Sequence, residues 1–182
     1  MKAIVFLLGT LLSRSAAAEE KRAWDRGSDP LLLKVTERNI NALPLQGQIA
    51  DSRKAWSSDF WSKKKGGINY RWNAQRPIGF NLKSPSKEQA AKMSIAELST
   101  LAATEKLDLF SGAYDYPLKR EIARYADSDA PSWEGICNGW SEAALHHNEP
   151  LAVIVVNPDG ISIPFGCSDI KALLSWYYFR QL

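Results

Sequence analysis

Cys137 stands in a setting that suits a reactive thiol. The stretch Gly-Ile-Cys-Asn-Gly-Trp places it between Gly135 and Gly139, directly before a run of residues that favours a helix. The reactive form of cysteine is the thiolate, and the unpaired amides and dipole at a helix N-terminus favour that anion. The same amides can stabilise an oxyanion in acyl transfer. The sequence therefore predicts that Cys137 is a catalytic nucleophile.

The residues around Cys137 predict a narrow, accessible cleft. Because glycine has no Cβ, Gly135 and Gly139 allow backbone or substrate to approach closely. Trp133 and Trp140 flank the cysteine, and their rings are placed to wall a cleft for an extended acyl donor. The combination of these features ahead of a helix is more specific than any one of them.

A thiol nucleophile also needs a base, which is usually a histidine. The chain has two histidines, His146 and His147. At ~1.5 Å and ~100° per residue, His146 would lie roughly 13 Å from Cys137 and on the opposite face of a continuous helix. We interpret both histidines as surface residues that interact with the helix C-terminus, so the sequence shows a nucleophile without its base.

The second cysteine, Cys167, leaves a structural alternative open. An even number of cysteines in an exported chain suggests a disulfide. If Cys137 and Cys167 were bonded, the nucleophile would be lost, and the chain would be a non-enzymatic secreted protein recognised by a host or a partner.

The N-terminus is typical of a secretory signal peptide. Lys2 precedes the apolar run AIVFLLGTLL, and small residues at Ala16 and Ala18 predict cleavage before Glu19. The alternative, a retained membrane anchor, is disfavoured because Gly, Thr, Ser and Arg interrupt the run. We expect residues 1–18 to be removed, residues 19–42 to form a weakly ordered leader, and the mature protein to be secreted or to lie in the cell wall or periplasm.

Charge gives little support for a polyanionic partner. Lys and Arg total 23 and Asp and Glu total 20, a net charge of +3, and removal of Lys2 and Arg14 with the signal lowers this to +1. We therefore expect no nucleic-acid partner, and no membrane association after cleavage. No cofactor or metal ligand is predicted, and calcium dependence stays open.

The remaining pattern predicts a mostly helical α+β fold. Capping boxes start helices at Ser86 with Gln89 and at Ser94 with Glu97. Two β-branched runs around Asn-Pro-Asp-Gly predict a hairpin with Pro164 at an edge. Residues 35–73 are predicted to be mostly irregular, with one short helix and aromatic side chains that wrap over the core. The predicted helices cover residues 86–93, 94–110, 117–126, 138–147 and 168–182, the last with Ser168 as its N-cap and Asp169 in its first turn. The predicted strands cover residues 151–156 and 161–165.

Several blocks in the same order resemble the transglutaminase elicitor family, a group of secreted transglutaminase-like proteins. They include PSWEGICNGWSEAA, PDGISIPFGCSDIKALLS, ATEKLDLFSGAYDYPL and the tryptophan-rich block that ends in GINYRW. The similarity runs from about Leu43 to the end of the chain. It implies a transglutaminase-like domain over residues 43–182, with Cys137 at the nucleophile position.

The resemblance implies protein-glutamine γ-glutamyltransferase chemistry, with a protein glutamine as donor and a lysine amine as acceptor. The family completes its triad with His and Asp downstream of the SDIKALL helix, and nothing in the sequence corresponds to them. We therefore expect a papain- or transglutaminase-like half domain, truncated before the His and Asp part and inactive as an isolated chain. Asn138 replaces the usual His, and Cys167 is unusual in its block. A diverged, inactive chain and a papain-like thiol peptidase are the alternatives.

Overall fold

A computed structural model describes residues 39–42, 46 and 55–181 of the chain. All of the described residues fall in one compact unit, Glu37–Leu182. The predicted signal peptide lies outside the described residues, as does all of the predicted leader except its last four residues. In the described part no helix is long and apolar enough to cross a membrane.

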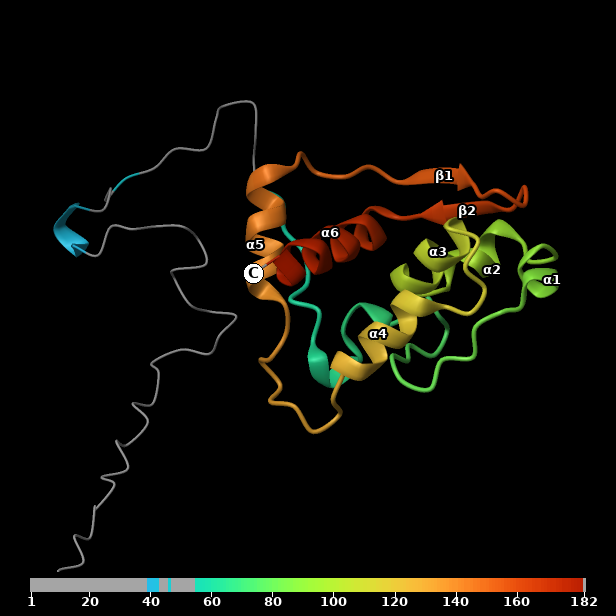
Figure 1. The fold of residues 1–182 in the computed structure, drawn as a ribbon, viewed down its shortest axis with the longest axis horizontal. Helices are drawn as coiled ribbons and strands as arrows, with labels where there is room; N and C mark the ends of the chain where they lie inside the picture. The colour runs from blue at the N-terminus through green and yellow to red at the C-terminus, as the bar shows by residue number, and fades with distance from the viewer. Residues whose placement is uncertain (1–38, 43–45, 47–54, 182) are drawn as a thin grey trace, which may run out of the picture. The chain divides into compact units, whose positions relative to one another are not determined.

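The architecture is α+β and mostly helical, as predicted (Figure 1). A two-stranded antiparallel sheet accompanies short helices, of which the last is the longest. Among the described residues, the 3₁₀ helices are η3 (Ile40–Ala42), η4 (Lys63–Lys65) and η5 (Gly67–Asn69). The regular elements are α1 (Lys87–Ala90), α2 (Ile95–Ser99), α3 (Ala103–Phe110), α4 (Pro117–Tyr125), α5 (Cys137–His146), β1 (Val153–Val156), β2 (Ser162–Phe165) and α6 (Cys167–Gln181).

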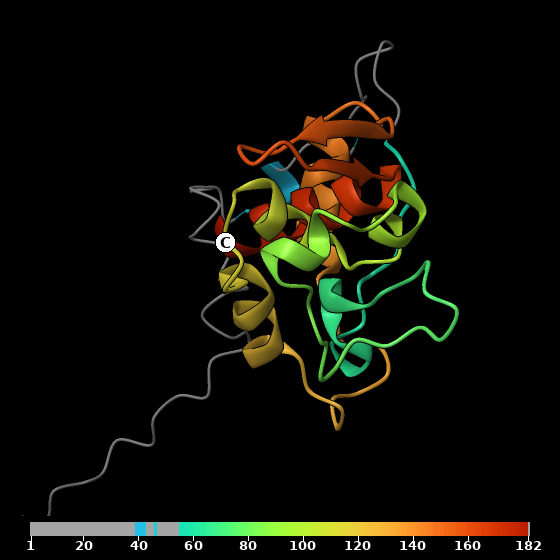
Figure 2. The same cartoon turned by 90° about the vertical axis from the view of Figure 1, so that its right-hand side faces the viewer.

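The hairpin forms as its turn residues predict. Val153 pairs with Phe165 and Val156 with Ser162. The side chain of Asn157 accepts the backbone N–H of Ile161 at 2.8 Å and so holds the turn closed. β2 faces the helices, because its Ile163 and Phe165 are buried in one hydrophobic cluster with residues of α2 and α3, against which residues of α6 pack. Figure 2 shows the hairpin lying along this helical layer.

The prediction of one helix over residues 94–110 is wrong. The chain leaves α2 after Ser99 and begins α3 at Ala103. The cause is Glu105, whose buried carboxylate accepts the N–H of Ala102 at 3.0 Å and thereby starts a new helix. That carboxylate is fixed from a distant segment by a two-pronged pair with Arg71, at 2.7 Å and 2.5 Å.

The predicted start of the last helix also needs a correction. α6 begins at Cys167, so Ser168 lies within the first turn and is not the N-cap. Asp169 closes the turn, because its Oδ2 accepts the N–H of Gly166 at 2.7 Å. The same oxygen is 2.7 Å from Nζ of Lys106, which is buried on α3. The Asp169 carboxylate therefore accepts a backbone amide at the start of α6 and links this helix to α3.

One hydrophobic cluster holds α5 in place for the functional site. Its members come from distant segments and are buried together: Trp61, Ile68, Ala103, Ile122, Ile136, Ala172 and Trp176. Ile136 is the residue directly before α5. Burial of its side chain therefore fixes where α5 begins.

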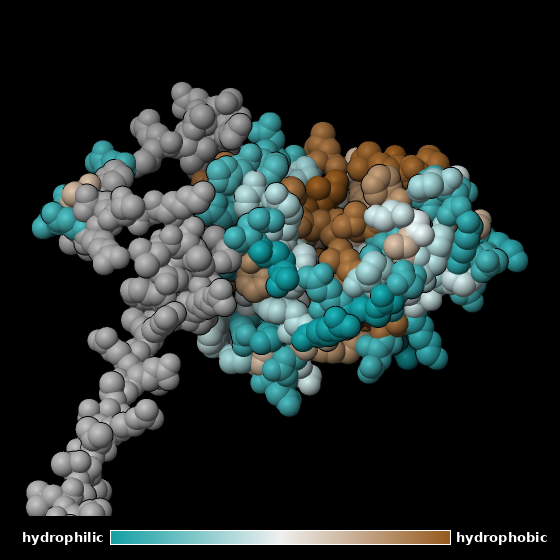
Figure 3. Space-filling view, in the orientation of Figure 1, coloured by the Kyte–Doolittle hydropathy of each residue, from teal (hydrophilic) through white to brown (hydrophobic). Residues whose placement is uncertain are grey.

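The outer strand of the hairpin is apolar and exposed. Figure 3 shows a hydrophobic surface over this part of the molecule. Its exposed members include Leu151, Val153, Ile154 and Val156. Among the described residues β1 pairs only with β2, so its other edge has free backbone groups.

Candidate active site

Cys137 is the first residue of α5 and is exposed, so the helix starts one residue earlier than predicted. No side chain caps this helix start, and no acidic residue lies in its first turn. The first amides of a helix have no partner inside the helix. Cys137 therefore sits where uncapped N–H groups and the positive end of the helix dipole face solvent.

The two glycines of the motif are required by backbone packing. A Cβ on Gly135 would lie 2.2 Å from the carbonyl oxygen of Phe60, and one on Gly139 would lie 2.1 Å from that of Ser175. The amide of Ile136 donates to the Phe60 carbonyl at 2.9 Å. The glycines bring the segment 57–63 and helix α6 against the start of α5. The sequence predicted that the glycines admit either backbone or substrate. The structure shows that backbone atoms approach both glycines closely.

Tryptophans hold α5 from the side. The indole of Trp140 donates to the carbonyl of Trp56 at 3.2 Å, and that of Trp56 donates to the carbonyl of His147 at 3.1 Å. Trp140 is half-buried and packs against Ala143 and Ala144, so it belongs partly to the core. Trp133 is 75% exposed and is available at the surface.

A second set of contacts fixes the loop that enters α5. Lys63 donates from its amide to the Glu134 carbonyl at 2.9 Å, and its Nζ lies 2.8 Å from Glu134 Oε1. Lys63 also lies over the ring of Tyr125, 5.4 Å from its centroid. Burial raises the pKa of Tyr125 to about 12, and the charges of Glu134 and Cys137 add to this effect. Lys63 thus links Tyr125 to the loop that enters α5.

The histidines lie at the far end of α5. His146 is its last residue, and its Nε2 is 3.2 Å from Oε2 of Glu142. Nε2 of His147 is 3.0 Å from the hydroxyl of Tyr178. The helix is continuous from Cys137 to His146, so nine residues at ~1.5 Å each separate the thiol from the nearer histidine. Neither histidine is placed to take its proton.

The two cysteines do not form a disulfide. Both lie in the part of the chain that the structure describes, and both are free and exposed. Cys137 starts α5 and Cys167 starts α6. This arrangement removes the disulfide on which the non-enzymatic alternative depended.

Metal binding finds no support in the described residues. In them no group of three or more His, Cys, Asp or Glu side chains lies close enough to hold an ion.

Sequence reasoning missed Phe60, whose carbonyl accepts the amide directly before Cys137, and Tyr125, which contacts Lys63 beside the loop that enters α5. Tyr125 ends α4, and Phe60 lies in the irregular segment before η4. The aromatic content of residues 56–72 indicated burial over the core, but no local pattern relates Phe60 to a position 75 residues further on. Only the packing of Gly135 against the Phe60 carbonyl brings the two together.

These features define an α+β domain that presents a free thiol on the first turn of a helix. The chain belongs to the transglutaminase elicitor family, whose model matches residues 32–181. This match confirms the predicted family and includes Cys137 with both of its flanking glycines. No curated protein and no solved structure matches the chain.

Proposed function

We propose that the protein carries the nucleophile of a protein-glutamine γ-glutamyltransferase, and that Cys137 is this nucleophile. The thiol attacks the γ-carboxamide carbon of a protein glutamine, a C–S bond forms, and the C–N bond breaks to release ammonia. A lysine amine then attacks the thioester, and an isopeptide bond forms as the sulfur leaves. The substrates are accordingly a glutamine donor protein and a lysine acceptor protein.

The observation that carries the proposal is the uncapped start of α5 beneath an exposed thiol. Amides that have no other acceptor can stabilise the oxyanion of the tetrahedral intermediate. The glycine contacts and the buried side chain of Ile136 hold this turn against Phe60 and α6. The turn is therefore rigid before a substrate arrives, which is what electrostatic stabilisation of a transition state requires.

We infer that neither histidine of the chain serves as the proton acceptor. His146 and His147 are held at the other end of α5. The free edge of β1 offers backbone groups to which a strand bearing a base could add. We accordingly propose that this chain alone forms the acyl-enzyme slowly and does not turn over.

A glutamine-mimicking affinity label tests the proposal without the need for turnover. The reagent is a short peptide in which the glutamine is replaced by its diazoketone analogue, 6-diazo-5-oxonorleucine. This analogue places an electrophilic carbon where the carboxamide would lie. We expect the label on Cys137 and not on Cys167, as read by peptide mass spectrometry of the natively folded protein.

Two controls make this experiment decisive. Cys137→Ala removes the label if the assignment is correct, whereas Cys167→Ala leaves it in place. A peptide with the diazoketone on a side chain one methylene shorter reports whether glutamine geometry matters. Equal labelling of both cysteines, or none at Cys137, contradicts the proposal.

Export is a separate proposal that concerns residues outside the described part. We propose that residues 1–18 direct secretion and are then removed. N-terminal sequencing of the protein recovered from a secreting host should begin at Glu19. A first residue of Met1 would overturn this proposal.

A further inference from the structure

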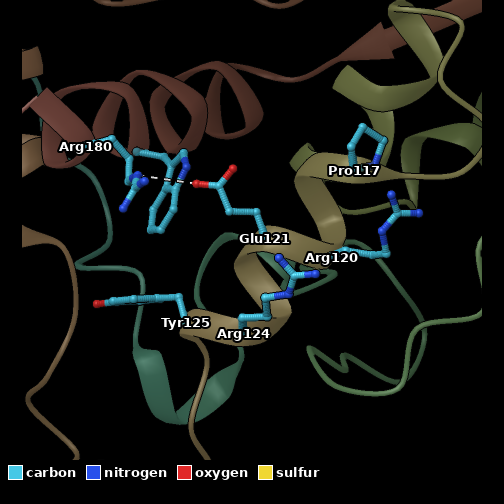
Figure 4. A pocket seen from close by; sticks show the side chains of 7 residues that line it. Pro117, Arg120, Glu121, Arg124, Tyr125 and Arg180 are labelled. Atoms are coloured by element: carbon cyan, nitrogen blue, oxygen red, sulfur yellow. Dashed lines mark ion pairs between the residues drawn. The ribbon is translucent and has the colours of Figure 1, made fainter.

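A charged groove lies between α4 and α6. Its volume is about 620 Å³. Figure 4 shows that one wall comes from α4 and the other from α6. The lining residues are Pro117, Arg120, Glu121, Arg124, Tyr125, Trp176 and Arg180.

The arginines of the groove differ in their partners. Arg180 is paired across the groove with Glu121, at 3.3 Å from Nε to Oε1, as Figure 4 shows. Arg120 is paired outside it with Asp115, at 2.8 Å. Within the part of the chain that the structure describes, Arg124 makes no ion pair. The groove therefore contains one uncompensated positive charge.

Aromatic rings form the other part of the lining. Tyr125 and Trp176 are in edge contact, with centroids 5.2 Å apart and an angle of 65° between the rings. The guanidinium of Arg180 lies 5.9 Å from the centre of the Trp176 ring. An apolar side chain that enters the groove thus meets aromatic carbon beside the guanidinium of Arg180, and Arg124 lines the same groove.

The placement of Arg124 is not explained by helix stability alone. Arg120 and Arg124 are four residues apart on α4, a spacing at which like charges repel. Arg124 lies in the last turn, where a cation interacts favourably with the helix dipole. The repulsion from Arg120 and the attraction to the helix dipole are of similar size and opposite sign, so the charge of Arg124 adds little to the stability of α4.

We propose that this groove binds an acidic peptide, through a carboxylate on Arg124 and a neighbouring apolar or aromatic side chain on Tyr125 and Trp176. A guanidinium donates two parallel hydrogen bonds to a carboxylate, and aromatic rings add apolar contact area. Glu121 at the rim and the single free cation disfavour a polyphosphate backbone, which is bound by many positive charges. The site goes beyond the proposed acyl transfer and does not depend on it.

Calorimetric titration with two matched peptides tests the site. The probes are acetyl-Leu-Glu-Phe-Gly-amide and the same peptide with Gln in place of Glu. We expect the Glu peptide to bind about ten-fold more tightly, since a charged hydrogen bond is worth more than a neutral one. Its affinity should fall as salt is raised from 50 to 300 mM, because the groove is open to solvent.

Arginine variants separate the groove from general surface charge. Arg124→Gln should weaken the Glu peptide about ten-fold and leave the Gln peptide unchanged. Arg120→Gln changes the protein charge equally but should have a smaller effect, because Arg120 is already paired with Asp115. Circular dichroism on each variant checks that it is folded.

Three results would overturn the proposal. They are equal binding of the two peptides, equal loss of binding in the two arginine variants, and tighter binding of an oligothymidylate than of the Glu peptide. Failure of Cys137 to react with the glutamine-mimicking label would count against the proposed acyl transfer but would leave this site standing. The acyl-transfer proposal and the peptide-binding proposal can therefore be refuted independently.

Discussion

The starts of α5 and α6 form a natural comparison. Each helix begins with an exposed, free cysteine. At α6 the carboxylate of Asp169 accepts the Gly166 amide and pairs with Lys106. At α5 no side chain caps the helix, and the carboxylate of Glu134, which precedes it, is paired with Lys63 instead.

The difference shows that a cysteine at a helix start is not sufficient for a reactive site. A carboxylate in the first turn already occupies the positive end of α6. The corresponding end of α5 is left open to whatever negative charge develops there. The first turn of α6 stabilises the fold, whereas the first turn of α5 has free amides that can stabilise a reacting anion.

The largest expected effect comes from removing the carboxylate at α6. Asp169→Asn leaves the buried Lys106 without its countercharge and with the Ser99 carbonyl, at 3.0 Å, as its remaining acceptor, and this should lower the free energy of unfolding by about 3 kcal/mol. The change also opens the start of α6, so alkylation of Cys167 should become faster. Urea denaturation and timed alkylation measure the two effects.

The double variant Lys106→Met with Asp169→Asn serves as the control. It removes the buried charge together with its partner, so part of the lost stability should return. A double variant as unstable as the sum of both single changes would mean that the ion pair is not the cause.

A smaller loss is expected at the start of α5. Gly139→Ala places a Cβ 2.1 Å from a backbone oxygen of α6, which cannot move away cheaply. We expect a loss of about 2 kcal/mol in urea denaturation, although the same change inside an ordinary helix would be stabilising. A more stable variant would contradict the close packing of α5 on α6.

Gly160→Ala is a matched control for this loss. Gly160 has a φ of 81°, which an alanine adopts only with strain, but no atom lies within 4 Å of its added Cβ. The expected cost is about 1 kcal/mol and comes from backbone strain alone.

The smallest effect concerns Tyr125 and alkaline pH. Its pKa is raised to about 12 in the folded protein, above the ordinary value of 10, mainly by burial. The folded state therefore retains the phenol proton to a higher pH than the unfolded state does. The free energy of unfolding should fall as pH rises from 10 toward 12. Tyr125→Phe should flatten this part of the unfolding curve and leave its value at pH 8 nearly unchanged. An identical alkaline slope in both proteins would contradict the burial of the phenol.

Local signals were sufficient for many elements of the fold. The capping boxes of Ser86 with Gln89 and of Ser94 with Glu97 are formed as predicted, because both partners lie within one turn. The hairpin turn, with its Asn157 contacts, is likewise local. The break between α2 and α3 was not predictable, because Glu105 is fixed by Arg71 from another segment.

The candidate site was predictable only in part. The motif indicated the cysteine, the start of the helix and the reason that the histidines cannot reach it. It did not indicate what Gly139 packs against, since its partner Ser175 lies on another helix. The groove at Arg124 was also hidden, because it exists only where α4 and α6 lie side by side.

Competitive alkylation of the two cysteines tests the central claim most directly. The natively folded protein is treated with a limiting amount of iodoacetamide at pH 7, and peptide mass spectrometry follows both sites over time. We predict that Cys137 is modified at least about ten-fold faster than Cys167, because only its helix start is uncapped. Equal rates, or faster modification of Cys167, would contradict the account.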